Sequence, residues 1–199
     1  MTEIGKWIPV VSLILFMSII QFIGPEPFRF ETRLITDLEL WRVFSGHWVH
    51  ANWIHYFLNM AGFILCLALT GVNWNIWQWV WRILLLSLGI SLGFYVLHPE
   101  VSWYVGFSGV LFGLYVLTAY ASLKDQFVMS SILLLFIGVK IILEQYSSVN
   151  VTTGDLIGVP VMVDAHLYGV LMAVLLVLAQ TVYRKILQAG PNGSGSTKY

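Results

Sequence analysis

The chain has 199 residues, of which 58% are hydrophobic and only 10% are Asp, Glu, Lys or Arg. Soluble domains are about half apolar and about a quarter charged, so this composition excludes a soluble domain and indicates an integral membrane protein. Ten basic residues balance ten acidic ones, which leaves no electrostatic basis for binding nucleic acid. The single cysteine, Cys66, lies in an apolar run and excludes an internal disulfide.

Apolar runs bounded by polar or turn residues predict six membrane spans, because a span needs about 20 apolar residues. The runs are Trp7–Ile23, Ile54–Val72, Ile76–Leu97, Phe107–Ala121, Phe127–Leu143 and Met162–Val182. No small-x-small cleavage site precedes Pro25, so we expect the first run to be a retained helix and not a leader. The fold class is therefore an all-α integral membrane bundle of six transmembrane helices. It forms one domain over residues 1–189, followed by a flexible tail over residues 190–199.

The longest connection, between the first two spans, interleaves apolar and charged residues over residues 24–53. This pattern is typical of an amphipathic segment that lies among lipid headgroups. Within it, we expect Arg42 to order the loop as a hydrogen-bond donor and His47 to face water. Basic residues gather on one side of the alternating spans. Both termini are therefore expected in the cytoplasm, with the first, third and fifth loops outside.

Strong polar side chains stand near the starts of the second, fourth and sixth spans, which all run inward from the outer face. They are His55 with Asn59, Ser108, and His166. Small-x-x-x-small stripes at Gly109/Gly113 and Gly169/Ala173 allow the fourth and sixth spans to approach closely. We therefore expect the Ser108 hydroxyl to meet the His166 imidazole. The fourth run is short, which predicts that the loop before it dips to membrane depth and lines a water-filled cavity.

A serine beside a histidine indicates nucleophilic catalysis, because the imidazole takes the hydroxyl proton and later returns it to the leaving group. The backbone N–H of Ser108, with His55 and Asn59, is expected to stabilise the oxyanion. Asp164 stands only two residues from His166 and points elsewhere on a helix. We find no other acid for a triad in the sequence and expect a dyad, with Phe112 stacked on the imidazole.

Lys140 and Glu144 stand four residues apart near the outer end of the fifth span. This spacing places both side chains on one helix face and predicts an ion pair whose lysine reaches toward the membrane surface. A role in shaping the neighbouring loop is the alternative.

Three ordered motifs resemble the rhomboid family of intramembrane serine proteases over nearly the whole chain. They are Trp41-Arg42 followed by the spacing His50-x4-His55-x3-Asn59, then Gly106-Phe107-Ser108-Gly109, and finally Ala165-His166-x-x-Gly169. The resemblance implies a six-span rhomboid fold with Ser108 as nucleophile and His166 as base. It also implies oxyanion support from His55 and Asn59, and a nearby structural histidine at His50.

Further segments resemble the rhombosortase branch of that family. They are residues 45–59, the run Lys140 to Gln145, and residues 157–167. This resemblance implies exported substrates that end in a Gly-Gly motif, one apolar span and a basic tail. Two residues depart from the common rhomboid pattern: Phe112 stands where many members have tyrosine, and Ala173 replaces a glycine.

The expected function is thus a serine endopeptidase, without metal or cofactor, in a bacterial cytoplasmic membrane with its active site open to the periplasm. A catalytically silent rhomboid-like protein that binds membrane proteins is the main alternative, although such proteins usually lack the serine or the histidine. A metal or haem site at His50, His55, His166 and Asp164 is a third hypothesis, which the absence of a His-Glu-x-x-His motif disfavours. A transporter is disfavoured because no inverted repeat is evident.

Overall fold

A computed structural model describes residues 5–146 and 151–189. Over these residues the chain forms nine helices and two short strands. The helices are α1 (Trp7–Ile23), α2 (Thr32–Thr36), α3 (Arg42–Ser45), α4 (Trp53–Thr70), α5 (Ile76–Leu97), α6 (Ser108–Ser122), α7 (Phe127–Tyr146), α8 (Val151–Ile157) and α9 (Val163–Ala189). The strands are β1 (Phe30–Glu31) and β2 (Trp103–Tyr104).

Six of these helices coincide with the six predicted apolar runs, so the all-helical membrane architecture is confirmed. Four of them, α4, α5, α7 and α9, have the length and composition needed to cross a membrane. The other two, α1 with 17 residues and α6 with 15, are apolar but shorter. A count of six complete spans therefore stays a prediction, as does the single-domain boundary. The tail predicted for residues 190–199 lies outside the described residues.

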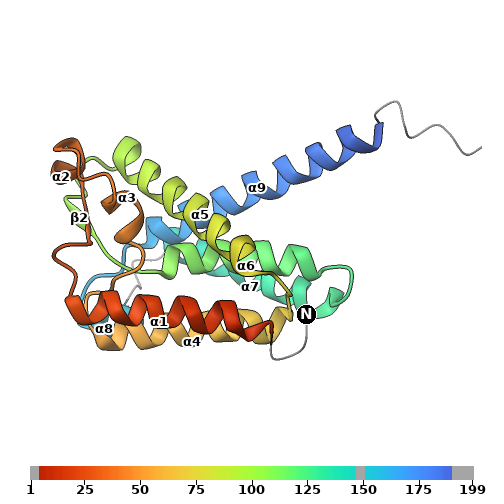
Figure 1. Ribbon diagram of the computed structural model, residues 1–199, viewed down its shortest axis with the longest axis horizontal. Coiled ribbons are helices and arrows are strands. Elements are labelled where there is room, and N and C mark those ends of the chain that lie inside the picture. Colours follow the sequence, from red (N-terminus) through yellow and green to blue (C-terminus); the bar gives the residue numbers. More distant parts are fainter. Residues whose placement is uncertain (1–4, 147–150, 190–199) are drawn as a thin grey trace, which may run out of the picture.

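Helix α6 lies at the centre of the bundle and packs against α4, α5, α7 and α9 (Figure 1). Its buried residues face several directions, because Val110, Leu111 and Val116 are all buried although they lie on different sides of the helix. By contrast, α9 packs along α6 from the contact of Gly169 with Gly109 to the hydrogen bond of Thr181 with Tyr120, and only its C-terminal part extends away from the other helices (Figure 1). A central helix surrounded by others holds its first residue in a fixed place.

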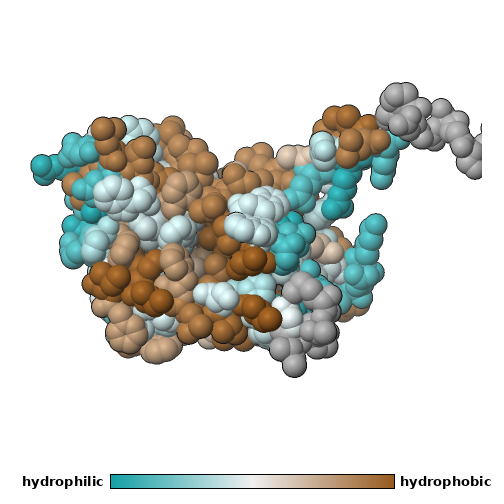
Figure 2. Space-filling model, viewed as in Figure 1, coloured by the Kyte–Doolittle hydropathy of each residue, from teal (hydrophilic) through white to brown (hydrophobic). Residues whose placement is uncertain are grey.

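The outer helices expose large apolar side chains, which is the reverse of a soluble surface. Phe22 on α1, Leu135 on α7 and Leu175 on α9 are 80%, 69% and 59% exposed. Figure 2 shows hydrophobic residues over broad stretches of the bundle's flank and hydrophilic residues gathered at its ends. Continuous apolar surface of this extent is stable against lipid and unstable in water.

The first loop is anchored to the segment that precedes α6. Strands β1 and β2 pair antiparallel, with Phe30 opposite Tyr104, which adds a small sheet to the predicted all-α fold. Arg42 is buried, and its guanidinium donates to the carbonyls of Glu26 and Arg29, so the prediction of a loop-ordering donor is confirmed. The loop therefore braces the approach to Ser108.

The expectation that His47 faces water is wrong. Its side chain is fully buried, and its Nε2 lies 2.9 Å from Ser91 Oγ on α5. Ser91 donates its own proton to the carbonyl of Val43, so His47 is the donor in this pair. Burial lowers the pKa of His47 to about 3, which keeps the imidazole neutral.

Candidate active site

Ser108 is the first residue of α6, and the backbone before it is shaped by Gly106. Gly106 has φ of +132°, a conformation that residues with a side chain rarely adopt. A Cβ at this position would also lie 2.8 Å from His55 Cε1. The Gly106 N–H donates to the carbonyl of Gly46, and its own carbonyl accepts from the Tyr104 hydroxyl. The turn that places Ser108 is thus tied to the first loop on one side and to β2 on the other.

The predicted meeting of hydroxyl and imidazole is present. Ser108 Oγ lies 2.9 Å from His166 Nε2, and His166 is only 4% exposed. The small residues of the two helices explain the approach, since a Cβ on Gly169 would collide with the Gly109 carbonyl and one on Gly113 would lie 2.7 Å from the Gly169 carbonyl. Only glycine at these positions allows α6 and α9 to pack at this distance.

Phe112, one turn after Ser108, stacks on the His166 ring as predicted. The two ring centroids are 4.3 Å apart and the planes differ by 4°. The phenyl face therefore restricts rotation of the imidazole while it leaves both ring nitrogens free to form hydrogen bonds.

The expectation that His166 has no acidic partner is corrected by the structure. Glu144 Oε2 on α7 lies 2.8 Å from His166 Nδ1. The predicted ion pair of Glu144 with Lys140 is confirmed, with Lys140 Nζ 2.6 Å from the other oxygen, Oε1. The carboxylate of Asp164, two residues before His166 in the chain, instead lies 3.9 Å from His98 Nε2. The four-residue spacing revealed the ion pair, but it contained no signal that α7 turns this carboxylate toward α9.

His55 and Asn59 differ in what they present to the site. The His55 ring lines the same cavity as Ser108, whereas Asn59 is buried and does not line it. The Asn59 amide donates to the backbone carbonyl of His55 at 2.9 Å. The oxyanion role of both residues stays a prediction.

His50 braces the loop before α4. Its backbone N–H donates to Gln21 Oε1 at 2.8 Å, and the Gln21 amide donates in turn to the His50 carbonyl. The ring is fully buried and meets the rings of His55 and Tyr56 edge-on, at 5.0 and 5.5 Å. Burial, with His55 nearby, holds the pKa of His50 well below its usual value, so the ring is a neutral packing element.

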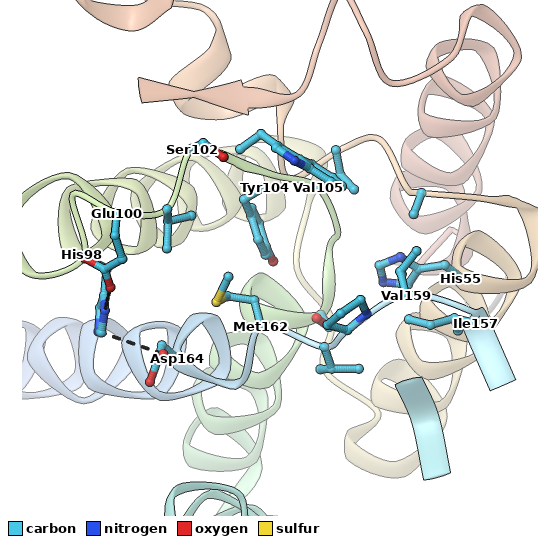
Figure 3. A pocket seen from close by; sticks show the side chains of 16 residues that line it. His55, His98, Glu100, Ser102, Tyr104, Val105, Ile157, Val159, Met162 and Asp164 are labelled. Carbon is cyan, nitrogen blue, oxygen red and sulfur yellow. Dashed lines mark hydrogen bonds and ion pairs between the residues drawn. The ribbon is translucent and has the colours of Figure 1, made fainter. Parts of the chain in front are cut away.

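A cavity of about 610 Å³ opens beside Ser108, where a water-filled hollow was predicted. His55 and Ser108 line one part of it, and the residues that follow α8 form a wall. Figure 3 shows Tyr104 and Met162 pointing into its middle, with His98, Glu100 and Asp164 together at the far end. The hydrogen bond from His98 lowers the pKa of Glu100, which keeps this end acidic.

Asn52 joins the helix that carries His55 to the wall of this cavity. Its side-chain oxygen accepts from the His55 N–H at 2.9 Å and so caps α4. Its amide donates to the carbonyl of Ile157, the last residue of α8, at 2.6 Å. One side chain thus fixes both the first turn of α4 and the end of α8.

A metal site would need three or more ligand side chains at one place. Within residues 5–146 and 151–189, no three His, Cys, Asp or Glu side chains come together as ligands. Both ring nitrogens of His50 are buried without a hydrogen-bond partner, and its nearest ring neighbours are His55 and Tyr56.

Residues 37–182 match the model of a known family, the Rhomboid domain. The match includes Ser108, His166, His55, Asn59 and Glu144. No curated protein matches the chain.

Proposed function

The chain belongs to the rhomboid family, and we propose that it is an intramembrane serine endopeptidase with Ser108 as its nucleophile. The observation that carries this proposal is the 2.9 Å contact between Ser108 Oγ and His166 Nε2 at the edge of a cavity. A hydroxyl becomes an effective nucleophile only when a base accepts its proton, and the imidazole is within direct reach.

The reaction proceeds in two stages. Ser108 Oγ attacks the carbonyl carbon of the scissile peptide bond while its proton passes to His166 Nε2. The tetrahedral intermediate collapses as the C–N bond breaks, and the proton on Nε2 moves to the leaving amine nitrogen. Water then gives a proton to Nε2 as its oxygen attacks the ester carbon, and Ser108 Oγ leaves with that proton.

Donors for the intermediate's negative oxygen come from the start of α6. The first N–H groups of a helix have no partner within the helix, and the positive end of the helix dipole lies there. The backbone N–H of Ser108 is therefore the first donor, and His55, across the cavity, is the second. Loss of one such donor typically lowers the rate by about 10²- to 10³-fold.

The substrate is a membrane-anchored protein whose apolar helix enters the bilayer beside the bundle. Its scissile bond must leave the helical conformation to expose its carbonyl, which glycine makes easier by about 1 kcal/mol per residue. We propose exported proteins that end in a Gly-Gly motif, an apolar segment and a basic tail, as in the rhombosortase branch. The site faces the periplasm of a bacterial cytoplasmic membrane, and the termini face the cytoplasm.

A catalytically silent binding protein is the second candidate. The geometry favours the enzyme, because a hydroxyl and an imidazole that serve only packing need no cavity beside them. The two functions differ in whether a covalent adduct can form on Ser108.

The test is co-expression of the wild type or Ser108→Ala with candidate proteins that carry the Gly-Gly tail, followed by mass spectrometry of their C-termini. We expect truncated products with the wild type and full-length chains with Ser108→Ala and His166→Ala. A fluorophosphonate should label the wild type at Ser108 alone.

The matched control is Ser12→Ala, which removes an exposed serine from α1 and should leave cleavage unchanged. The same products with Ser108→Ala as with the wild type would reject the nucleophile. Absence of both cleavage and labelling in a folded wild-type protein would favour the silent binder.

A further inference from the structure

Glu144 is a buried acid that the two-residue mechanism does not use. Its side chain is only 8% exposed, although it stands near the end of α7, whose neighbouring residues Leu143 and Gln145 are exposed. A carboxylate is removed from water at this depth only when other groups satisfy its oxygens. Both oxygens are satisfied here, one by Lys140 and the other by His166.

The two contacts fix which nitrogen of His166 carries the proton. A carboxylate paired with an ammonium group is ionised and only accepts hydrogen bonds. Glu144 Oε2 therefore accepts from His166 Nδ1–H at 2.8 Å, which leaves the lone pair of Nε2 facing Ser108 Oγ. The other tautomer would present an N–H to the hydroxyl and could not take its proton.

The same contact acts on the charge that forms during the reaction. When Nε2 accepts the Ser108 proton, His166 becomes a cation inside a protein interior, where charge is poorly solvated. Glu144 is the anion in contact with it. Among the described residues, Lys140 on α7, His55 on α4, Tyr104 on β2 and Asp164 on α9 are further titratable groups around this part of the site. The carboxylate stabilises the imidazolium and needs no proton itself.

We propose that Glu144 is the positioning residue of a Ser108–His166–Glu144 triad, an inference that rests on the proposed function. Lys140 fixes the orientation of the Glu144 carboxylate. Its Nζ binds Oε1 at 2.6 Å from one turn earlier on the same helix, so the other oxygen points across to α9. Phe112 restrains the imidazole plane, and Glu144 sets its rotation within that plane and its tautomer.

A purely structural ion pair is the competing explanation. A pair on one face of α7 needs no third partner, and truncation of either member would then act through folding alone. The triad instead requires that a change at Glu144 act on the chemical step. Glu144→Gln separates the two explanations, because glutamine keeps the shape but offers an N–H in place of one accepting oxygen.

The experiment uses the full chain in liposomes with a fusion protein that carries the Gly-Gly tail. For Glu144→Gln we expect kcat to fall by about 10²- to 10⁴-fold with KM within about threefold of the wild type. The acid limb of the pH–rate profile should move to lower pH, because the imidazolium has lost its anionic partner. Glu144→Asp should recover at least about tenfold of the loss, since it restores an accepting carboxylate.

Controls and an independent readout keep the test decisive. The rate of fluorophosphonate labelling of Ser108 should fall in parallel with kcat, and it does not depend on the choice of substrate. Lys140→Gln should lower kcat by about tenfold, and Gln145→Ala, at the exposed neighbouring position, should leave it unchanged.

Wild-type kcat and an unmoved acid limb in Glu144→Gln would overturn the inference. Equal losses in Glu144→Gln and Glu144→Asp, in step with a lowered unfolding temperature, would also overturn it and favour the structural pair. If Ser108→Ala abolishes cleavage in the same assay while Glu144→Gln does not affect it, the proposed function stands and only the triad falls. If Glu144→Gln does not fold, Glu144→Asp and Lys140→Gln take its place. Their kcat, acid limb and unfolding temperature then decide between the triad and the structural pair by the same criteria.

Discussion

Gly109→Ala places a methyl group at the contact between α6 and α9, next to Ser108 and His166. The new Cβ would lie 2.6 Å from the carbonyl oxygen of Ala165. Gly109 follows Ser108 in the chain, and Ala165 precedes His166. A displacement at this contact therefore passes directly to the Oγ–Nε2 pair.

The size of the displacement follows from ordinary packing distances. Non-bonded heavy atoms rest at about 3.5 Å, so the backbones must separate by about 0.9 Å. Added to the present 2.9 Å between Ser108 Oγ and His166 Nε2, this separation takes the pair to about 3.8 Å, beyond the range of a hydrogen bond. We expect kcat to fall by about 10²-fold. Overpacking should also lower the free energy of unfolding by about 1–3 kcal/mol.

The assay combines cleavage of the tailed fusion protein in liposomes, fluorophosphonate labelling of Ser108 and thermal unfolding. Gly138→Ala on α7 is the matched control, because no atom lies within 4 Å of a Cβ built there. This control should keep full activity and gain up to about 1 kcal/mol of helix stability.

Wild-type rates of both cleavage and labelling in Gly109→Ala would refute the reasoning. In that case the two helices could separate without loss of the serine–histidine contact, and close packing would not be what holds the site together.

Three further predictions test the surroundings of the site. Because burial lowers the pKa of His47 to about 3 from an ordinary 6.5, the unfolded chain binds its proton first as the pH falls. The contribution of His47 to stability is complete above pH 6.5 and is lost toward pH 3, which makes it about 2 kcal/mol smaller at pH 5 than at pH 7. Chemical denaturation of His47→Gln should therefore show a loss of stability between pH 7 and pH 5 that is smaller than that of the wild type by this amount. Phe112→Leu removes the flat ring that stacks on His166, and kcat should fall by roughly tenfold because an aromatic pair contributes about 1 kcal/mol. Phe112→Tyr keeps the ring and should retain activity. Equal rates in the two variants would exclude a role for stacking. Asn52→Ala removes the cap of α4 and the hydrogen bond to the Ile157 carbonyl. A denaturant titration should show a free energy of unfolding lower by about 1–2 kcal/mol. An unchanged midpoint would show that neither hydrogen bond contributes to stability.

The positions of the helices and the convergence of their polar groups could be predicted from the amino-acid sequence. Inside lipid, a chain segment must hydrogen-bond its own backbone groups, so a long apolar run forms a helix over its whole length. For this reason α4, α5 and α7 begin and end within a few residues of their predicted positions. The meeting of Ser108 with His166 was predictable because both residues stand at the same depth beside small-residue stripes, and such stripes have few ways to pack.

The contacts that depend on helix rotation and on the path of the first loop became visible only in the folded protein. Glu144 reaches His166 because α7 is rotated to face α9, and a four-residue spacing fixes a helix face without saying toward which neighbour it turns. His47 is buried because the first loop folds back through β1 onto the segment before Ser108, although its local sequence is that of an interfacial turn. Hydrophobic periodicity encodes depth and amphipathic faces, whereas the rotation of one buried helix against another depends on side-chain packing across elements far apart in the chain.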